Sequence, residues 1–182
     1  MKKKYLFILF IAVALIQAAI PVSMMIEQED TLATGTPFKF RTQPVDPNDP
    51  FRGKYIILNY EIDEYSNTRQ SWERGEAIYV YLKNDASGYA QIETISKEKL
   101  PSRSDYVVGE VNWGRGQGMT IYFDFPFDRF YMNEAKAKPA ENIVNLGGEF
   151  LETYALIHVK NGTGVIKDVY VNDIPIGDYV DQ

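Results

Sequence analysis

The residues from Lys54 to Asp63 constrain the fold of this chain more than any others, because their side chains alternate with a period of two. Successive side chains of an extended chain point to opposite faces, so this period predicts a β-strand. One face carries Ile56, Leu58, Tyr60 and Ile62, and the other carries Tyr55, Ile57, Asn59 and Glu61. Because Tyr55 and Ile57 are also large and apolar, we expect this strand to be covered on both sides and to lie at the centre of a sheet.

The same kind of segment recurs along most of the chain. Further strands are predicted over residues 37–41, 76–82, 89–95, 105–113, 119–125, 150–160 and 165–171. The 13 tyrosines and 10 phenylalanines suit half-buried sheet surfaces, and Asn161-Gly162 favours a tight type I′ turn. The predicted fold class is therefore mainly β, an antiparallel sandwich or partly open barrel of about seven or eight strands preceded by one transmembrane helix. Further helix is expected only near residues 133–138, ended by Pro139.

A stiff acidic turn, P-V-D-P-N-D-P, precedes the first of these strands. Pro44, Pro47 and Pro50 fix the backbone angle φ at three places and remove three amide donors, so the segment is a poor strand. Asp46 and Asp49 can accept hydrogen bonds from nearby amides, as Asx turns do.

Two arginines bracket the turn and predict ion pairs with its carboxylates. Arg41 precedes the turn and Arg52 follows it, while Gly53 permits a backbone conformation that a side chain would forbid. Two interpretations remain open: a self-contained corner that starts the core strand, or a rigid platform that presents Arg52 and the carboxylates to a ligand or partner. A calcium loop is disfavoured, since Pro50 stands where the next oxygen ligand is needed.

The N-terminus predicts a membrane segment. Lys2–Lys4 precede the apolar residues Tyr5–Ile26, which as a helix would be about 33 Å long, enough for a hydrocarbon core of about 30 Å. The alternatives are a retained anchor and a cleaved signal peptide. Ala12 and Ala14, the clearest pair with cleavage-site spacing, lie too close to the start, so a retained anchor is favoured.

These features divide the chain into four parts. Residues 1–4 form a cytoplasmic tip, 5–26 the transmembrane anchor (or signal peptide), 27–36 a short connector, and 37–182 an extracytoplasmic β domain. Because lysines stay on the cytoplasmic side, we expect a single pass through the cytoplasmic (inner) membrane, with the domain on the extracytoplasmic side.

The charge balance and the absence of cysteine exclude several kinds of function. Three of the 19 basic residues are Lys2–Lys4, which leaves 16 basic against 25 acidic residues in the outer part. The resulting net charge of −9 disfavours nucleic acid as a partner, because neutralising phosphates needs a basic surface. It also disfavours adhesion to anionic lipid. Without cysteine the chain has no disulfide, thiolate nucleophile or cysteine-bound metal.

Residues 41–62, R-T-Q-P-V-D-P-N-D-P-F-R-G-K-Y-I-I-L-N-Y-E-I, closely resemble the signature of the GDYXXLXY proteins, a family of bacterial membrane-associated proteins. The motif letters are matched by Gly53, Tyr55, Leu58 and Tyr60, whereas Lys54 stands where the motif has aspartate. Residues 128–138 carry a second, weaker likeness. The resemblance implies no assigned activity. It implies an accessory or assembly role, because members are often encoded beside polytopic membrane proteins.

Candidate catalytic groups are few. The single histidine, His158, shares a predicted strand face with Tyr154 and Leu156, so a packed structural role is expected. Ser23 lacks the proline of a signal-peptidase signature, and the glycine-rich loop 114–118 lacks the Lys-Ser/Thr pair of a P-loop. Carboxylates for glycoside hydrolysis are abundant, but sequence spacing cannot place two of them across a cleft. No catalytic residue, metal or cofactor is predicted.

The sequence therefore favours a membrane-anchored accessory or binding partner of a polytopic membrane protein. One alternative is a small-ligand module for a sugar or anion, and a less favoured one is an acid-pair hydrolase; whether the chain is an enzyme, and its oligomeric state, stay open. Residues expected to form or support the binding surface are Arg41, Asp46, Asp49, Arg52, Tyr55 and Tyr60. Residues expected to shape the motif are Pro44, Pro47, Pro50, Gly53 and Leu58.

Overall fold

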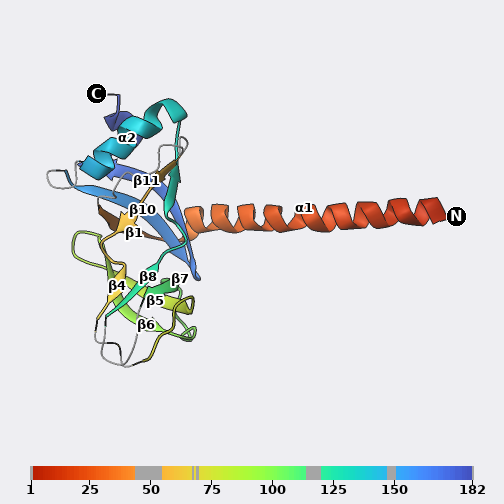
Figure 1. Ribbon diagram of the computed structural model, residues 1–182, viewed down its shortest axis with the longest axis horizontal. Coiled ribbons are helices and arrows are strands. Elements are labelled where there is room, and N and C mark those ends of the chain that lie inside the picture. The colour runs from red at the N-terminus through yellow and green to blue at the C-terminus, as the bar shows by residue number, and fades with distance from the viewer. Residues whose placement is uncertain are drawn as a thin grey trace.

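The molecule consists of a long apolar helix and a β domain (Figure 1). The computed structural model describes residues 2–43, 55–66, 68, 70–113, 120–146 and 151–181. Helix α1, Lys2–Thr34, leaves the side of the domain with its apolar side chains exposed. Among the described residues it is the one helix that is long and apolar enough to cross a membrane.

Two five-stranded antiparallel sheets and a two-stranded sheet form the domain. The first sheet, in the order β12-β11-β10-β1-β3, contains β1 Thr36–Gln43, β3 Asn59–Tyr60, β10 Thr153–Lys160, β11 Thr163–Val171 and β12 Ile174–Pro175. The second, in the order β4-β8-β7-β5-β6, contains β4 Glu64–Tyr65, β5 Ala77–Asn84, β6 Ala90–Ser96, β7 Tyr106–Trp113 and β8 Ile121–Asp124. The third sheet pairs β2 Tyr55–Ile57 with β9 Arg129–Tyr131. Two further helices are α2 Glu134–Leu146 and α3 Ile176–Tyr179.

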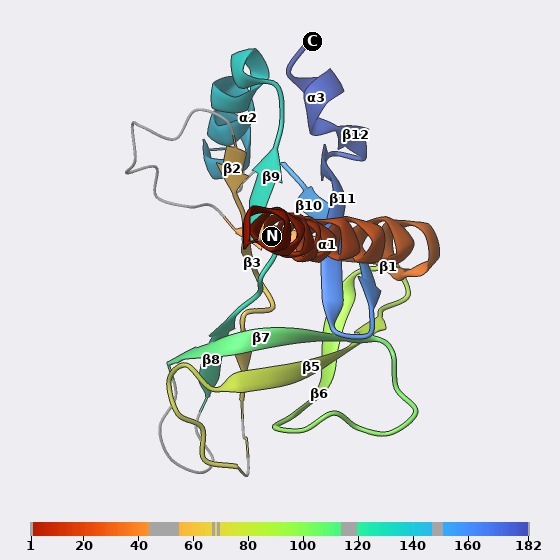
Figure 2. The same cartoon turned by 90° about the vertical axis from the view of Figure 1, so that its right-hand side faces the viewer.

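Single-residue parallel bridges join the two large sheets. Lys39 of β1 pairs with Tyr89 just before β6, and Val107 of β7 pairs with Gly162 in the turn between β10 and β11. In Figure 2 the strands β5 to β8 lie below α1, while β9, α2 and α3 lie above it. The predicted class, mainly antiparallel β after an apolar helix, is confirmed. The described residues form 12 strands because β2, β3, β4, β9 and β12 are only two or three residues long.

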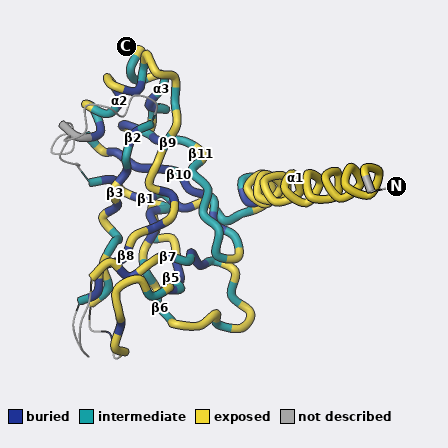
Figure 3. The backbone as a smooth tube through the Cα atoms, turned by 45° about the vertical axis from the view of Figure 1, so that its right-hand side comes forward, coloured by how far each residue is buried: buried dark blue, intermediate teal, exposed yellow. Residues whose placement is uncertain are grey.

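Aromatic rings fill the centre of the core. Phe40 of β1 meets Tyr60, Phe125 and Phe127 edge-on, with ring centroids 5.3 to 5.5 Å apart. Such edge-to-face pairs add to the free energy gained from burying the rings. Figure 3 shows the resulting contrast between buried segments of the domain and the exposed length of α1.

The strand predicted over 54–63 exists in its described part, but it is divided at Leu58. β2 pairs with β9, β3 pairs with the end of β1, and the amide of Leu58 donates to the carbonyl of Asp128 at 2.8 Å. The predicted inner face is confirmed for Ile56, Leu58 and Tyr60, which are buried. The predicted position at the centre of a sheet is wrong, because the chain changes partner at Leu58 and leaves β3 as an edge strand.

Helix α2 continues through Pro139, where the sequence predicted its end. Asn133 caps the helix, since its side-chain oxygen accepts from the amide two residues later at 3.0 Å. Ala137 and Val144 are buried in the core. Burial of this face therefore outweighs the one backbone hydrogen bond that Pro139 cannot donate.

Candidate functional site

Polar contacts fix the end of α1 to the β10–β11 hairpin. The Lys160 ammonium lies 2.6 Å from Asp30 Oδ2 and donates to Thr34 Oγ1 at 2.7 Å. Glu27 lies about two turns before Thr34 on the same helix, and its Oε1 atom accepts a hydrogen bond from the Thr163 hydroxyl at 2.8 Å. Residues 27–34, which we call the root of α1, are thus helical and docked. Most of the segment expected as a short connector is therefore a continuation of α1.

The end of the root comes unusually close to β10. The amide of Gly35 donates to the Thr31 carbonyl at 2.8 Å, and Thr31 itself is buried. A β-carbon at position 35 would lie 2.5 Å from the Thr31 carbonyl oxygen and 3.1 Å from that of Val159. Glycine is therefore required for α1 to end against β10 in this way.

His158 lies on β10 beside the root, in keeping with the packed role expected from the sequence. Its Nδ1 atom is buried and has no hydrogen-bond partner among the described residues. Burial, and next the charge of Lys167, hold the pKa of His158 below its ordinary value, while a weaker backbone hydrogen bond with Leu32 acts in the opposite direction. The imidazole is therefore neutral at pH 7 and contributes packing rather than charge.

Most of the signature turn lies outside the described residues. This applies to Pro44, Asp46, Pro47, Asp49, Pro50, Arg52 and Gly53, whose roles stay predictions. Leu58 and Tyr60 are buried, and the Tyr60 hydroxyl donates to the Phe127 carbonyl at 2.6 Å. Burial, with the nearby charge of Asp128, raises the pKa of Tyr60. Tyr60 therefore supports the surface from within and does not form it.

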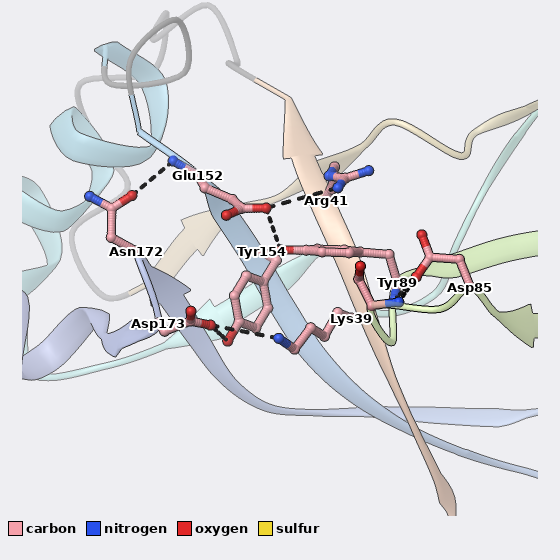
Figure 4. Close-up of polar contacts among 9 residues, drawn as sticks. Lys39, Arg41, Asp85, Tyr89, Glu152, Tyr154, Asn172 and Asp173 are labelled. Atoms are coloured by element: carbon pink, nitrogen blue, oxygen red, sulfur yellow. Dashed lines mark hydrogen bonds and ion pairs between the residues drawn. The ribbon is translucent and has the colours of Figure 1, made fainter.

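Arg41 belongs to an ordered cluster on the outer face of β1 and β10 (Figure 4). Its guanidinium carbon lies 3.8 Å from the centroid of the Tyr89 ring, a cation–π contact. The Tyr89 hydroxyl donates to Glu152 Oε1 at 2.6 Å, and the guanidinium lies 3.9 Å from the same oxygen. Burial, and then the hydrogen bond to Glu152, raise the pKa of Tyr89 to about 12.

A second triad of the same chemistry lies beside the first. The ammonium of Lys39 lies 4.7 Å from the centroid of the Tyr154 ring, and the Tyr154 hydroxyl donates to Asp173 Oδ1 at 2.7 Å. Lys39 completes the triad at 3.6 Å from the same carboxylate oxygen. The hydrogen bond from Tyr154, and then the charge of Lys39, hold the pKa of Asp173 below its usual range.

The two triads brace the place where the large sheets meet. Tyr89 comes from the second sheet, whereas Lys39 and Arg41 come from the first. Each cation lies near a carboxylate that also accepts a hydrogen bond from a tyrosine. This arrangement gives Arg41 partners within the domain, and its part in a binding surface stays a prediction. Sequence reasoning missed its partner Glu152 because the two lie far apart in the chain and no local pattern connects them.

The motif residue Tyr55 belongs to an exposed aromatic surface on β2 and β9. Its ring packs on Tyr131 with the centroids 5.4 Å apart, and the guanidinium carbon of Arg129 lies 5.4 Å from the Tyr55 centroid. Tyr131 is 66% exposed. We call Tyr55, Arg129 and Tyr131 the β2–β9 surface. Tyrosine and arginine are the side chains enriched at protein interfaces, so this surface has the composition of a contact site.

Three carboxylates surround a small cavity of about 180 Å³. Asp63, Asp124 and Asp128 line it, and burial raises the pKa of Asp63 with help from the charges of Glu64 and Asp124. The cavity is smaller than the roughly 300 Å³ at which ligand pockets usually begin. It therefore gives no support to an acid-pair hydrolase. The described part of the chain also holds no group of three or more Asp, Glu or His side chains arranged for a metal ion.

Comparison with known proteins connects most of the chain to a family. The family model described as GDYXXLXY protein matches residues 17–169. No curated protein and no solved structure matches the chain. The matched region begins within α1 and ends within β11, so it includes the root of α1, the motif, the second large sheet and the first large sheet up to β11.

Proposed function

The chain belongs to the GDYXXLXY family, and we propose that it is a single-pass membrane protein whose β domain is the accessory or binding partner of an integral membrane protein. The N-terminal apolar helix fits the anchoring part of this proposal. Lys2–Lys4 support a cytoplasmic N-terminus and a domain on the extracytoplasmic side of the inner membrane, since such residues stay on the cytoplasmic side.

The observation that carries the proposal is the rigid connection between anchor and domain. A flexible linker would let the domain rotate freely above the membrane. Here α1 continues as a helix to Thr34 and is held to the hairpin through Lys160 and Thr163. Every copy therefore presents the same face toward the bilayer. Fixed presentation benefits a module that engages a neighbour in the same membrane.

The β2–β9 surface is the part of the domain best suited to that contact. β9 lies beside α1 in Figure 2, and Gln28 of the root lines the same cleft as Arg129 and Tyr131. The surface is therefore held close to where α1 meets the membrane, within reach of the outer loops of an integral protein. Its tyrosines offer large contact area with few rotatable bonds, and Arg129 offers directed hydrogen bonds.

Affinity capture of the full chain from solubilised membranes tests this function. The wild-type chain is expected to recover an integral membrane protein in a stoichiometric amount. A Tyr55→Ala/Tyr131→Ala double variant should lose about tenfold or more of that recovery, because exposed aromatic anchors dominate interface energetics. Tyr122→Ala removes an exposed tyrosine from β8 and should recover the partner normally. Recovery of the bait alone, or equal recovery by the double variant, would refute the proposal.

Sidedness has its own test. Protease added to the outside of cells stripped of their outer layers should digest the domain and leave the segment before residue 27 protected. Digestion that occurs only after the inner membrane is opened would place the domain in the cytoplasm and overturn this part of the proposal.

A further inference from the structure

A cleft of about 590 Å³ opens at the root of α1, between the helix, β9 and β11. Gln28 lines it from the helix, residues 126–131 from β9 and the loop before it, and residues 164–167 from β11. In Figure 2, β9 and the labelled part of β11 lie next to each other above α1. The volume of the cleft falls within the range of small-molecule binding sites, roughly 300–1,000 Å³.

The position of Gln28 sets the depth of the cleft relative to a bilayer. The apolar run of α1 ends at Ile26, two residues before Gln28, and the polar residues Glu27 and Glu29 flank the latter. Two residues of helix rise about 3 Å, while the headgroup layer on each side of a bilayer is about 5–7 Å thick. With the apolar run in the hydrocarbon core, the cleft lies at the level of the lipid headgroups.

The charges around the cleft suit a phosphate group. Arg129 and Lys167 line it, with Asp128 as the one acidic residue of the lining. Asp128 lies 3.7 Å from Arg129 Nε, and among the described residues no carboxylate lies within ion-pair distance of Lys167. The lining thus carries one net positive charge, although the outer part of the chain as a whole carries −9.

The remaining lining is apolar, as the glycerol and upper acyl region of a lipid requires. Phe127, Phe130, Val165 and Ile166 contribute to the cleft. Gly164 also lines the cleft, and a larger residue does not fit there because its β-carbon would overlap the Phe127 ring. Cationic and apolar side chains in one lining match the phosphate and the acyl end of a phospholipid headgroup region, whereas a free anion would make no contact that needs the apolar residues.

We propose that this cleft binds the headgroup of a membrane phospholipid, with the Arg129 guanidinium and the Lys167 ammonium donating hydrogen bonds to its phosphate oxygens. The inference rests on the proposed membrane anchoring. The bound lipid would fill the angle between α1 and the domain and so add to the rigidity of the root.

Photo-crosslinking of the full chain in lipid nanodiscs tests the assignment. The probe is a phosphatidylglycerol that carries a photoreactive group next to its phosphate, and mass spectrometry identifies the labelled peptides. Label is expected on residues 126–131 and 164–167 as well as on α1. An Arg129→Gln/Lys167→Gln double variant should lose about tenfold of the label on the cleft peptides and keep the label on α1. Arg74→Gln/Lys83→Gln removes the same charge from exposed positions elsewhere and should label like wild type.

The outcomes separate this inference from the proposed function. Label on α1 with none on the cleft peptides, or cleft label that survives the double variant, overturns the lipid site and leaves the cleft to a protein partner. Absence of label from α1 as well would refute the membrane anchoring itself. Excess inorganic phosphate should leave the cleft label unchanged, and its loss would identify free phosphate as the ligand in place of lipid.

Discussion

Replacing Gly35 by alanine should weaken the attachment of α1 to the domain. The new β-carbon would lie 2.5 Å from the carbonyl oxygen of Thr31, and 3.1 and 3.2 Å from backbone atoms of Val159. All three neighbours are backbone, so no side chain can turn away and the helix end must move from β10. Overpacking of this kind costs about 1–3 kcal/mol. At the middle of that range, about 2 kcal/mol, and with about 2–4 °C per kcal/mol for a chain of this size, we expect Tm to fall by about 4–8 °C.

Thermal unfolding of the full chain in detergent micelles, followed by circular dichroism of the β domain, measures this effect. Gly177→Ala is the matched control, because nothing lies within 4 Å of a β-carbon at that position. Its Tm should stay within about 2 °C of wild type. An unchanged Tm for Gly35→Ala would show that the root of α1 does not need its close approach to β10, and the argument for rigid docking would fail.

Three further changes test neighbouring parts of the structure. Tyr89→Phe removes the hydrogen bond to Glu152 and should lower the free energy of unfolding by about 1 kcal/mol in denaturant titration, with the slope m unchanged. An unchanged free energy of unfolding would show that this contact does not stabilise the domain. The wild-type chain should lose stability on acidification below about pH 6.5, because there His158 binds a proton in the unfolded chain but, with its lowered pKa, not yet in the folded one. His158→Gln should abolish this loss. A wild-type stability that is flat over this window would contradict the lowered pKa of His158. Lys160→Ala should raise hydrogen exchange at residues 31–34 several-fold without affecting the core strands, and equal exchange in both proteins would count against docking through this lysine.

Features set by local chemistry could be predicted from the sequence. Alternation identified the buried face of Ile56, Leu58 and Tyr60, because a period of two has one meaning in an extended chain. The Asn161-Gly162 turn is present with both residues at positive φ, as a type I′ turn requires. The apolar N-terminal run forms the expected helix.

Features set by distant partners could not be predicted. The same alternation fits one straight strand and a chain that changes partner at Leu58, so the division into β2 and β3 is invisible locally. Pro139 reads as a helix end unless the burial of Ala137 and Val144 is known. Polarity alone predicts a connector over residues 27–36, whereas contacts with Lys160 and Thr163, far along the chain, hold residues 27–34 as a docked helix.

The fixed angle between α1 and the domain can be measured with a pair of spin labels. The chain contains no cysteine, so Met25→Cys on α1 and Lys83→Cys on β5, both exposed, accept labels without background. Double electron–electron resonance on the full chain in nanodiscs then gives the distribution of distances between them. A docked root predicts a single narrow distribution that broadens in Gly35→Ala. A broad distribution in the wild-type chain would mean that the domain swings freely above the membrane and would contradict the account.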